Sequence, residues 1–215
     1  MDRRKALKNM GLSLGYAVAT PTLISIVQGC NNEKVLEWTP YFFTKEEGAV
    51  LTHLVDIILP KTDTPSATEV KVDIFIDRLA DQVMQKEQQN FLKMSMGKFI
   101  EKAIADSGKE TAVELVPKEL EAVLGIALGI SKEEQESYYE ALENYMGALD
   151  EGTTIWLDAN VAINAFAKNV RGMTIWGYKT SEYVGKEVLA YLPVPGEYIS
   201  CGSTEELTGG KAWSL

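Results

Sequence analysis

The chain has 215 residues, with 31 acidic and 21 basic side chains and a formal net charge of −10. This excess of negative charge argues against nucleic acid as a partner, which needs a basic surface, and against broad electrostatic binding to anionic lipid. With one histidine, two cysteines and no Cys-x-x-Cys-His motif, the sequence also excludes covalent c-type haem and a Cys/His zinc cluster.

Residues 1–29 have the three parts of an export signal, which is removed from the mature protein. The start is cationic and contains Arg3 and Arg4, the stretch 10–29 is uncharged and largely apolar, and the exit is the small residue Gly29. Glycines and a proline interrupt the apolar part, so a cleaved signal is favoured over a permanent membrane span. The alternative is an N-terminal amphipathic helix that belongs to the fold.

The exit sequence Val27-Gln28-Gly29-Cys30 resembles the lipobox of bacterial lipoproteins, in which the cysteine thiol takes a diacylglycerol group. We therefore expect Cys30 to be a lipid attachment site that anchors the protein on the periplasmic side of a bacterial membrane, with residues 30–42 as a linker. The Arg3-Arg4 pair resembles a twin-arginine signal, which exports folded cargo. An ordinary Sec signal that contains two arginines by chance is the alternative.

The signal carries four of the 21 basic and one of the 31 acidic residues, so the remaining 186 residues have 17 and 30, a net charge of −13. This length suits one domain, which we place at residues 43–215. If Cys30 is lipidated, Cys201 has no partner within the chain. It is then either a buried thiol or a site for pairing with another chain, and the usual burial of free cysteines favours the first.

Capping signals and apolar periodicity predict an all-α domain. The first helix, 44–59, begins at the capping box Thr44-x-x-Glu47 and stops at Pro60. No stretch alternates with a period of two, so we expect a single compact bundle of about six to eight helices with an irregular C-terminal tail from Pro193. The other helices are predicted at about 68–85, 87–106, 117–128, 131–149 and 154–172, and from a Ser181 cap to about Tyr191.

The polar residues offer few groups for catalysis, since no Gly-x-Gly-x-x-Gly follows a strand and no Gly-x-Ser-x-Gly elbow occurs. His53 and Asp56 could form an acid/base pair on the first helix, but a histidine that faces solvent or packs between helices is favoured. Asp63 and Thr64 could bind a substrate hydroxyl. Before Pro65, however, they are more typical of a turn whose side chains bond the nearby backbone.

The segment 171–201 is dense in aromatic residues, with glycine and proline between them. Such a loop suggests a binding surface for another protein. The alternative is that these rings cap the core of the bundle itself, and the two interpretations are compatible. The candidates for a partner interface are Trp176, Tyr178, Tyr183, Tyr191, Tyr198 and Cys201.

Two stretches of the chain each carry a distinctive sequence motif. The first is Ile58-Leu59-Pro60-Lys61-Thr62-Asp63-Thr64-Pro65-Ser66-Ala67, followed by Phe75-Ile76-Asp77. The second is Gly177-Tyr178-Lys179-Thr180-Ser181-Glu182, followed by Tyr191-Leu192-Pro193-Val194-Pro195-Gly196-Glu197-Tyr198 and Cys201. Over about residues 43–201 the chain thereby resembles the gluconate 2-dehydrogenase subunit 3 family, with Ser66 where that family usually has glycine.

The resemblance implies a small exported subunit beside a flavin-containing dehydrogenase of sugars or sugar acids. FAD is then expected in that catalytic partner, haem c in a cytochrome c where a third subunit is present, and no cofactor in this chain. Members with a twin-arginine signal are thought to carry the folded, signal-less flavoprotein across the membrane.

The leading hypothesis is therefore a non-catalytic accessory subunit that exports, anchors and stabilises a periplasmic FAD-dependent dehydrogenase. One alternative is an enzyme that uses His53 with Asp56 or Asp63. The other is a lipoprotein scaffold or solute-binding module unconnected to redox chemistry.

Overall fold

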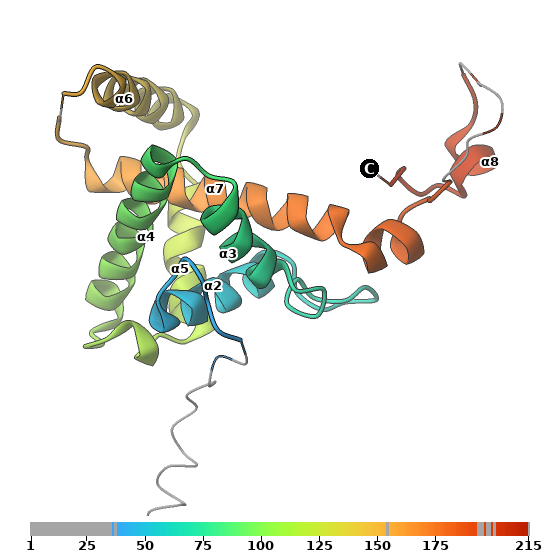
Figure 1. Ribbon diagram of the computed structural model, residues 1–215, viewed down its shortest axis with the longest axis horizontal. Helices are drawn as coiled ribbons and strands as arrows, with labels where there is room; N and C mark the ends of the chain where they lie inside the picture. Colours follow the sequence, from blue (N-terminus) through green and yellow to red (C-terminus); the bar gives the residue numbers. More distant parts are fainter. Residues whose placement is uncertain are drawn as a thin grey trace, which may run out of the picture. The chain divides into compact units, whose positions relative to one another are not determined.

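The computed structural model of the protein describes residues 36, 38–153, 155–192, 196, 199 and 201–214. Within them lie seven α-helices, one 3-10 turn and one π-helical turn, without a β-strand (Figure 1). The prediction of an all-α bundle is confirmed for this part of the chain, and none of its helices is long and apolar enough to cross a bilayer. The elements are α2 (Lys45–Ile58), α3 (Val72–Gln82), α4 (Lys86–Ser107), η1 (Ala112–Glu114), α5 (Pro117–Leu128), α6 (Lys132–Asp150), α7 (Ala159–Thr180), η2 (Val184–Val188) and α8 (Thr204–Thr208).

Helix α7, orange in Figure 1, is the axis of the bundle, and α2, α3, α4, α5 and α6 all pack against it. Every residue from Val161 to Ala167 is buried, which is the pattern of a helix surrounded on all sides. Three residues of this stretch are alanines, whose small side chains let the neighbouring helices approach. The ring of Phe166 meets that of Phe99 on α4 with 5.2 Å between centroids, a typical core aromatic pair.

Helix ends follow the sequence where a local capping signal sets them. Thr44 caps α2 through a capping box with Glu47, as predicted. Pro117 is the first residue of α5, where its missing N–H has no helical partner to lose. Ser131 and Glu134 form the predicted capping box of α6.

The second helix begins later than the sequence predicts, at Val72 rather than about residue 68. Lys71, its N-cap residue, has a left-handed backbone with φ 62°, which few residues other than glycine adopt. Residues 68–71 therefore form a turn, and the backbone of Lys71 sets the direction in which the chain enters α3.

The sixth predicted helix, 154–172, is shifted toward the C-terminus and corresponds to α7. Its start is set by Asp158, whose carboxylate accepts a hydrogen bond of 2.8 Å from the backbone N–H of Asn160. Its end extends to Thr180 because Met173, Thr174 and Gly177 are buried against the bundle and carry the helix past the exposed Gly172.

A carboxylate on α3 fastens the segment through which the chain enters the domain. Asp77 has no exposed surface, and its two oxygens accept the backbone N–H groups of Tyr41, Phe42 and Phe43 at 2.8, 3.0 and 3.1 Å. Hydrogen bonds from neutral donors to a charged acceptor are stronger than neutral pairs, and a buried N–H without an acceptor is destabilising. We call residues 38–43 the entry segment and Asp77 its clamp.

A second buried carboxylate, Asp73, lies one helical turn before the clamp and ties the entry segment to α2. It accepts hydrogen bonds from Trp38 Nε1 at 3.0 Å and from the Thr52 hydroxyl at 2.8 Å. Burial raises the pKa of this carboxyl, although the hydrogen bonds from Thr52, the Ile74 N–H and Trp38 oppose the rise.

Asp77→Asn is expected to lower the free energy of unfolding by about 2–3 kcal/mol, because one carboxylate oxygen becomes an NH₂ donor that faces a backbone donor. Asp81→Asn is the matched control, since this side chain is exposed on the same helix and its replacement should stay within about 0.5 kcal/mol. Urea denaturation of the purified protein measures both. Equal effects of the two substitutions would show that the clamp contributes nothing.

Asp73→Asn is expected to change how stability depends on pH. Because the folded protein holds the Asp73 proton at higher pH than the unfolded chain does, this group stabilises the fold most below the ordinary carboxyl pKa of about 3.9. Its contribution falls as pH rises through the raised pKa of the folded state. The unfolding free energy of wild type minus that of Asp73→Asn should therefore decrease with pH. Urea denaturation from below the ordinary carboxyl pKa to above the raised pKa measures this difference, and an increase with pH would contradict a raised pKa for Asp73.

Candidate functional site

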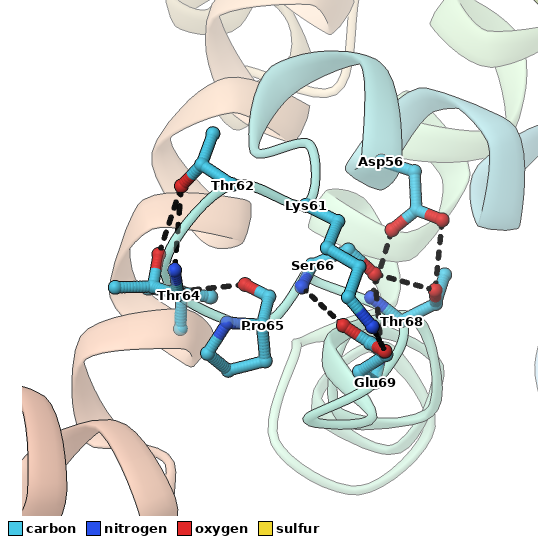
Figure 2. Close-up of polar contacts among 9 residues, drawn as sticks. Asp56, Lys61, Thr62, Thr64, Pro65, Ser66, Thr68 and Glu69 are labelled. Atoms are coloured by element: carbon cyan, nitrogen blue, oxygen red, sulfur yellow. Dashed lines mark hydrogen bonds and ion pairs between the residues drawn. The ribbon is translucent and has the colours of Figure 1, made fainter.

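The loop between α2 and α3, residues 59–71, is held in one conformation by its own polar groups (Figure 2). Asp56, at the end of α2, accepts hydrogen bonds from the N–H and the hydroxyl of Thr68 at 2.9 and 2.8 Å. Glu69 accepts from the Ser66 N–H at 2.8 Å and pairs with Lys61 at 2.5 Å. The hydrogen bond from Lys61 is the main cause that lowers the pKa of Glu69, and the same contact raises the pKa of Lys61.

These contacts decide between the interpretations of the loop's polar residues. Asp56, a candidate acid/base partner of the half-buried His53, has both oxygens engaged with the loop and so acts as a structural anchor. The turn interpretation of residues 62–65 is supported, because the Thr62 N–H donates to the Thr64 carbonyl at 3.0 Å. The side chain that bonds the backbone there is that of Thr62, while Asp63 is exposed.

The loop is joined to the C-terminal end of α7 across 113 positions of sequence. The Tyr178 hydroxyl donates a hydrogen bond of 2.8 Å to the carbonyl of Pro65. One residue earlier, Gly177 touches the ring of Phe75 on α3, and a Cβ at this position would lie only 2.6 Å from that ring. Phe75 also meets Trp176 edge-on, with 5.1 Å between ring centroids. The two motifs singled out in the sequence therefore contact each other.

Side-chain hydrogen bonds form at the C-terminal end of helix α7, and a π-helical turn follows. The sequence predicts that Ser181 caps a following helix; instead its hydroxyl donates backward to the Tyr178 carbonyl at 2.7 Å. The same carbonyl also accepts the Ser181 backbone N–H at 3.2 Å, so both donors of Ser181 contribute to the end of the helix. The turn η2 follows at Val184–Val188, and Lys186 pairs with Glu182 at 2.7 Å on its surface.

An open groove of about 780 Å³ lies between the loop and the η2 turn. Charges of both signs line it, and the exposed ring of Tyr183 stands at its edge. The lining contains neither histidine nor cysteine, and no group of His, Cys, Asp and Glu in the described part of the chain could hold a metal ion. The exposed aromatic ring and the charges of both signs suit recognition of another molecule. The charged lining residues are Lys61, Asp63, Glu69, Lys71, Glu182, Lys186 and Glu187.

The family model of gluconate 2-dehydrogenase subunit 3 matches residues 45–196, which begin at the first residue of α2 and include both walls of the groove. The chain belongs to the gluconate 2-dehydrogenase subunit 3 family. No curated protein and no solved structure gives a significant match to it.

In this family member, the aromatic candidates divide into packed and exposed rings. Tyr178 is half-buried against the core, so the interpretation as a core cap holds for it. Trp176, Tyr183 and Tyr191 are exposed to 48%, 53% and 51%. Trp176 and Tyr178 lie on α7, so the expectation that they belong to a loop is wrong. Tyr198, like Arg3, Arg4 and Cys30, lies outside the described residues.

Residues 189–214 form what we call the C-terminal arm, in which none of the described residues is buried. The arm returns on itself, because the Ala190 N–H donates to the Ala212 carbonyl at 2.8 Å and the Ser214 N–H to the Ala190 carbonyl at 2.9 Å. The tail that we expected to be irregular therefore contains a pair of backbone hydrogen bonds between its two ends and the short helix α8. Cys201 is exposed in the arm, so the expectation of a buried thiol is wrong. Tyr191, Leu192, Ile199 and Trp213 are each about half exposed there.

Gly177→Ala is expected to lower the free energy of unfolding by about 1–3 kcal/mol, because the added methyl group would overlap the Phe75 ring. Gly172→Ala on the same helix is the matched control, since a Cβ there meets no atom within 4 Å. The control should stabilise by about 0.5–1 kcal/mol through helix propensity alone. Urea denaturation measures the change in the free energy of unfolding of each variant, and the two changes should have opposite signs. Changes in the same direction would contradict close packing at Gly177.

Proposed function

We propose that this protein is a non-catalytic accessory subunit that exports, anchors and stabilises a periplasmic FAD-dependent dehydrogenase of a sugar or sugar acid. Its family is named for a subunit of gluconate 2-dehydrogenase, which implies association with a dehydrogenase catalytic subunit. The observation that carries the proposal is the joining of the two motifs by the Tyr178–Pro65 hydrogen bond at the edge of an open groove.

The groove and the adjoining C-terminal arm are the proposed surface for the catalytic subunit. Exposed aromatic rings at Trp176, Tyr183 and Tyr191 supply the residue types that contribute most to protein interfaces. The arm buries none of its own described apolar side chains, so Leu192, Ile199 and Trp213 are accessible to a partner. The charges of both signs in the groove would fix the orientation of the partner more than its affinity.

Export and anchoring are assigned to the N-terminal 30 residues. A flavoprotein has to fold around FAD before it leaves the cytoplasm, so only an exporter of folded proteins can move it. Arg3 and Arg4 would supply the twin-arginine signal for both chains, and Cys30 would keep the complex at the membrane. FAD belongs to the partner in this proposal, and a cytochrome c with haem c would accept the electrons where a third subunit exists.

The clamp at Asp77 supports the anchoring role. It fixes the backbone of residues 41–43 to α3, so that the chain leading from Cys30 enters a rigid part of the domain. Arg78 adds to this attachment, since its guanidinium lies 3.5 Å from the centre of the Tyr41 ring.

The proposal is tested by capture of the tagged chain from detergent-solubilised membranes of the native host, with flavin fluorescence and dehydrogenase activity as readouts. Wild type should recover a flavoprotein. Tyr183→Glu should reduce its recovery about tenfold, because a charge replaces an exposed ring at the groove. Val113→Glu is the matched control, since Val113 is 44% exposed on η1 and does not line the groove.

In the same experiment, replacement of Arg3 and Arg4 by lysine should leave the flavoprotein in the cytoplasmic fraction. Arrival of the flavoprotein in the periplasm of this variant would remove the export role and leave anchoring. Capture of wild type without any flavoprotein would overturn the whole proposal and favour a lipoprotein scaffold or solute-binding module.

A further inference from the structure

The π-helical turn η2 forms part of one wall of the groove, and the last described residues of the chain lie against this turn. Lys186 and Glu187 of η2 line the groove. Gly185, buried in the same turn, leaves room for Ser214, since an added Cβ there would lie only 3.0 Å from the Ser214 Oγ. Residues 211–214 therefore adjoin the groove wall, although none of them lines the groove itself.

Hydrogen bonds join residues 211–214 to η2 and to the chain that leaves it. The Ala190 N–H donates to the Ala212 carbonyl at 2.8 Å, and the Ser214 N–H donates to the Ala190 carbonyl at 2.9 Å. The Lys211 ammonium group makes a longer hydrogen bond, of 3.4 Å, to the Glu187 carbonyl. We call residues 211–214 the C-terminal brace, because they contact the turn both inside it and just after it.

A helical turn of five residues has little stability of its own. A short helix makes few internal hydrogen bonds for the backbone freedom that it loses, and π-helical turns are rare. In η2 the Leu189 N–H donates to the Val184 carbonyl at 2.9 Å, which is the i→i+5 spacing of such a turn. Val184 is buried and fixes the start of the turn. The exposed Lys186–Glu182 ion pair adds little, so the second half of η2 depends on the brace.

Two adjacent glycines return the chain to η2. Helix α8, red in Figure 1, ends at Gly209 with φ 62°, and Gly210 follows with φ 77°. Glycine is the residue that adopts this left-handed region without strain. The turn is closed by a hydrogen bond of 3.1 Å from the Gly210 N–H to the Thr204 carbonyl. The sequence Gly209-Gly210 thus sets the direction in which the brace leaves α8.

We propose that the C-terminal brace holds η2 in the conformation that the partner recognises, so that Gly210 and Ser214 are positioning residues for the groove. This inference rests on the proposed function, in which the groove receives the catalytic subunit. The brace fixes the backbone of residues 185–190 and thereby the directions in which Lys186 and Glu187 leave the wall. A wall that is ordered before binding loses less conformational entropy in the complex.

Amide hydrogen exchange, resolved by residue with NMR in the purified full chain, tests the brace without a partner. Gly210→Val places a β-branched residue at φ 77°, a conformation that such residues avoid, so the return to η2 should open. Exchange of the Leu189 amide, whose hydrogen bond lies within η2, should become at least tenfold faster. Amides of residues 161–167 in the core should keep their rates. An unchanged rate at Leu189 would overturn the proposal.

Two matched variants separate the brace from bulk and strain in general. Gly210→Asn also adds a Cβ, which meets the end of the Glu205 side chain at 3.0 Å, but asparagine tolerates the left-handed region. This variant should exchange Leu189 within about threefold of the wild-type rate. Gly152→Val introduces comparable strain at φ 72° in the turn after α6 and should leave Leu189 unchanged. Acceleration in Gly152→Val as large as in Gly210→Val would overturn the proposal.

Recovery of the flavoprotein in the membrane capture experiment tests the consequence for the partner. Gly210→Val should lower recovery about tenfold, and so should Ser214→Pro, which removes the N–H that donates to the Ala190 carbonyl. Gly210→Asn should recover as much as wild type. Undiminished recovery by both disrupting variants would overturn the role of the brace in recognition. Recovery of no flavoprotein by wild type would contradict the proposed function, whereas unchanged exchange at Leu189 contradicts the brace, so the two failures are distinguishable.

Discussion

The close approach of Gly177 to the ring of Phe75 determines where the C-terminal end of α7 meets α3, and the groove depends on that meeting. Only a residue without a side chain lets the ring lie against the helix backbone. With the two helices in this position, the next residue, Tyr178, reaches the Pro65 carbonyl. The loop and the η2 turn then become the two walls of one surface. A displacement of α7 by the width of a methyl group would stretch the Tyr178–Pro65 hydrogen bond beyond its bonding range.

The loop contributes its own rigidity to this arrangement. Asp56 and Glu69 satisfy donors within the loop, so its shape does not rely on the groove being occupied. A preformed surface loses less conformational entropy on binding than a flexible one, which favours affinity. The exposed Lys61–Glu69 pair adds little stability, as is usual for solvent-exposed ion pairs. The strong constraints are the contacts with partly buried groups, Asp56 with Thr68 and Tyr178 with Pro65.

The sequence predicted those features that depend on neighbouring residues. The caps at Thr44 and Ser131 and the start at Pro117 are local signals, and they appear where expected. The end of α7 and the exposure of Cys201 depend on packing between distant segments, which no local pattern contains. The role of Asp77 was hidden for the same reason, since its three donors lie more than thirty residues away. Its place in the Phe75-Ile76-Asp77 motif was the available signal.

Helix α7 links the core of the bundle to the groove. Residues 161–167 are buried on every side, whereas in the C-terminal half the buried Met173 and Gly177 share the helix with the exposed Ile175 and Trp176. One face of this half therefore packs against the bundle, and the other face is open to a partner. Because the buried face fixes the helix, the groove at its C-terminal end is positioned by the core rather than by a flexible linker. Such an arrangement suits a subunit whose contribution is to position another protein.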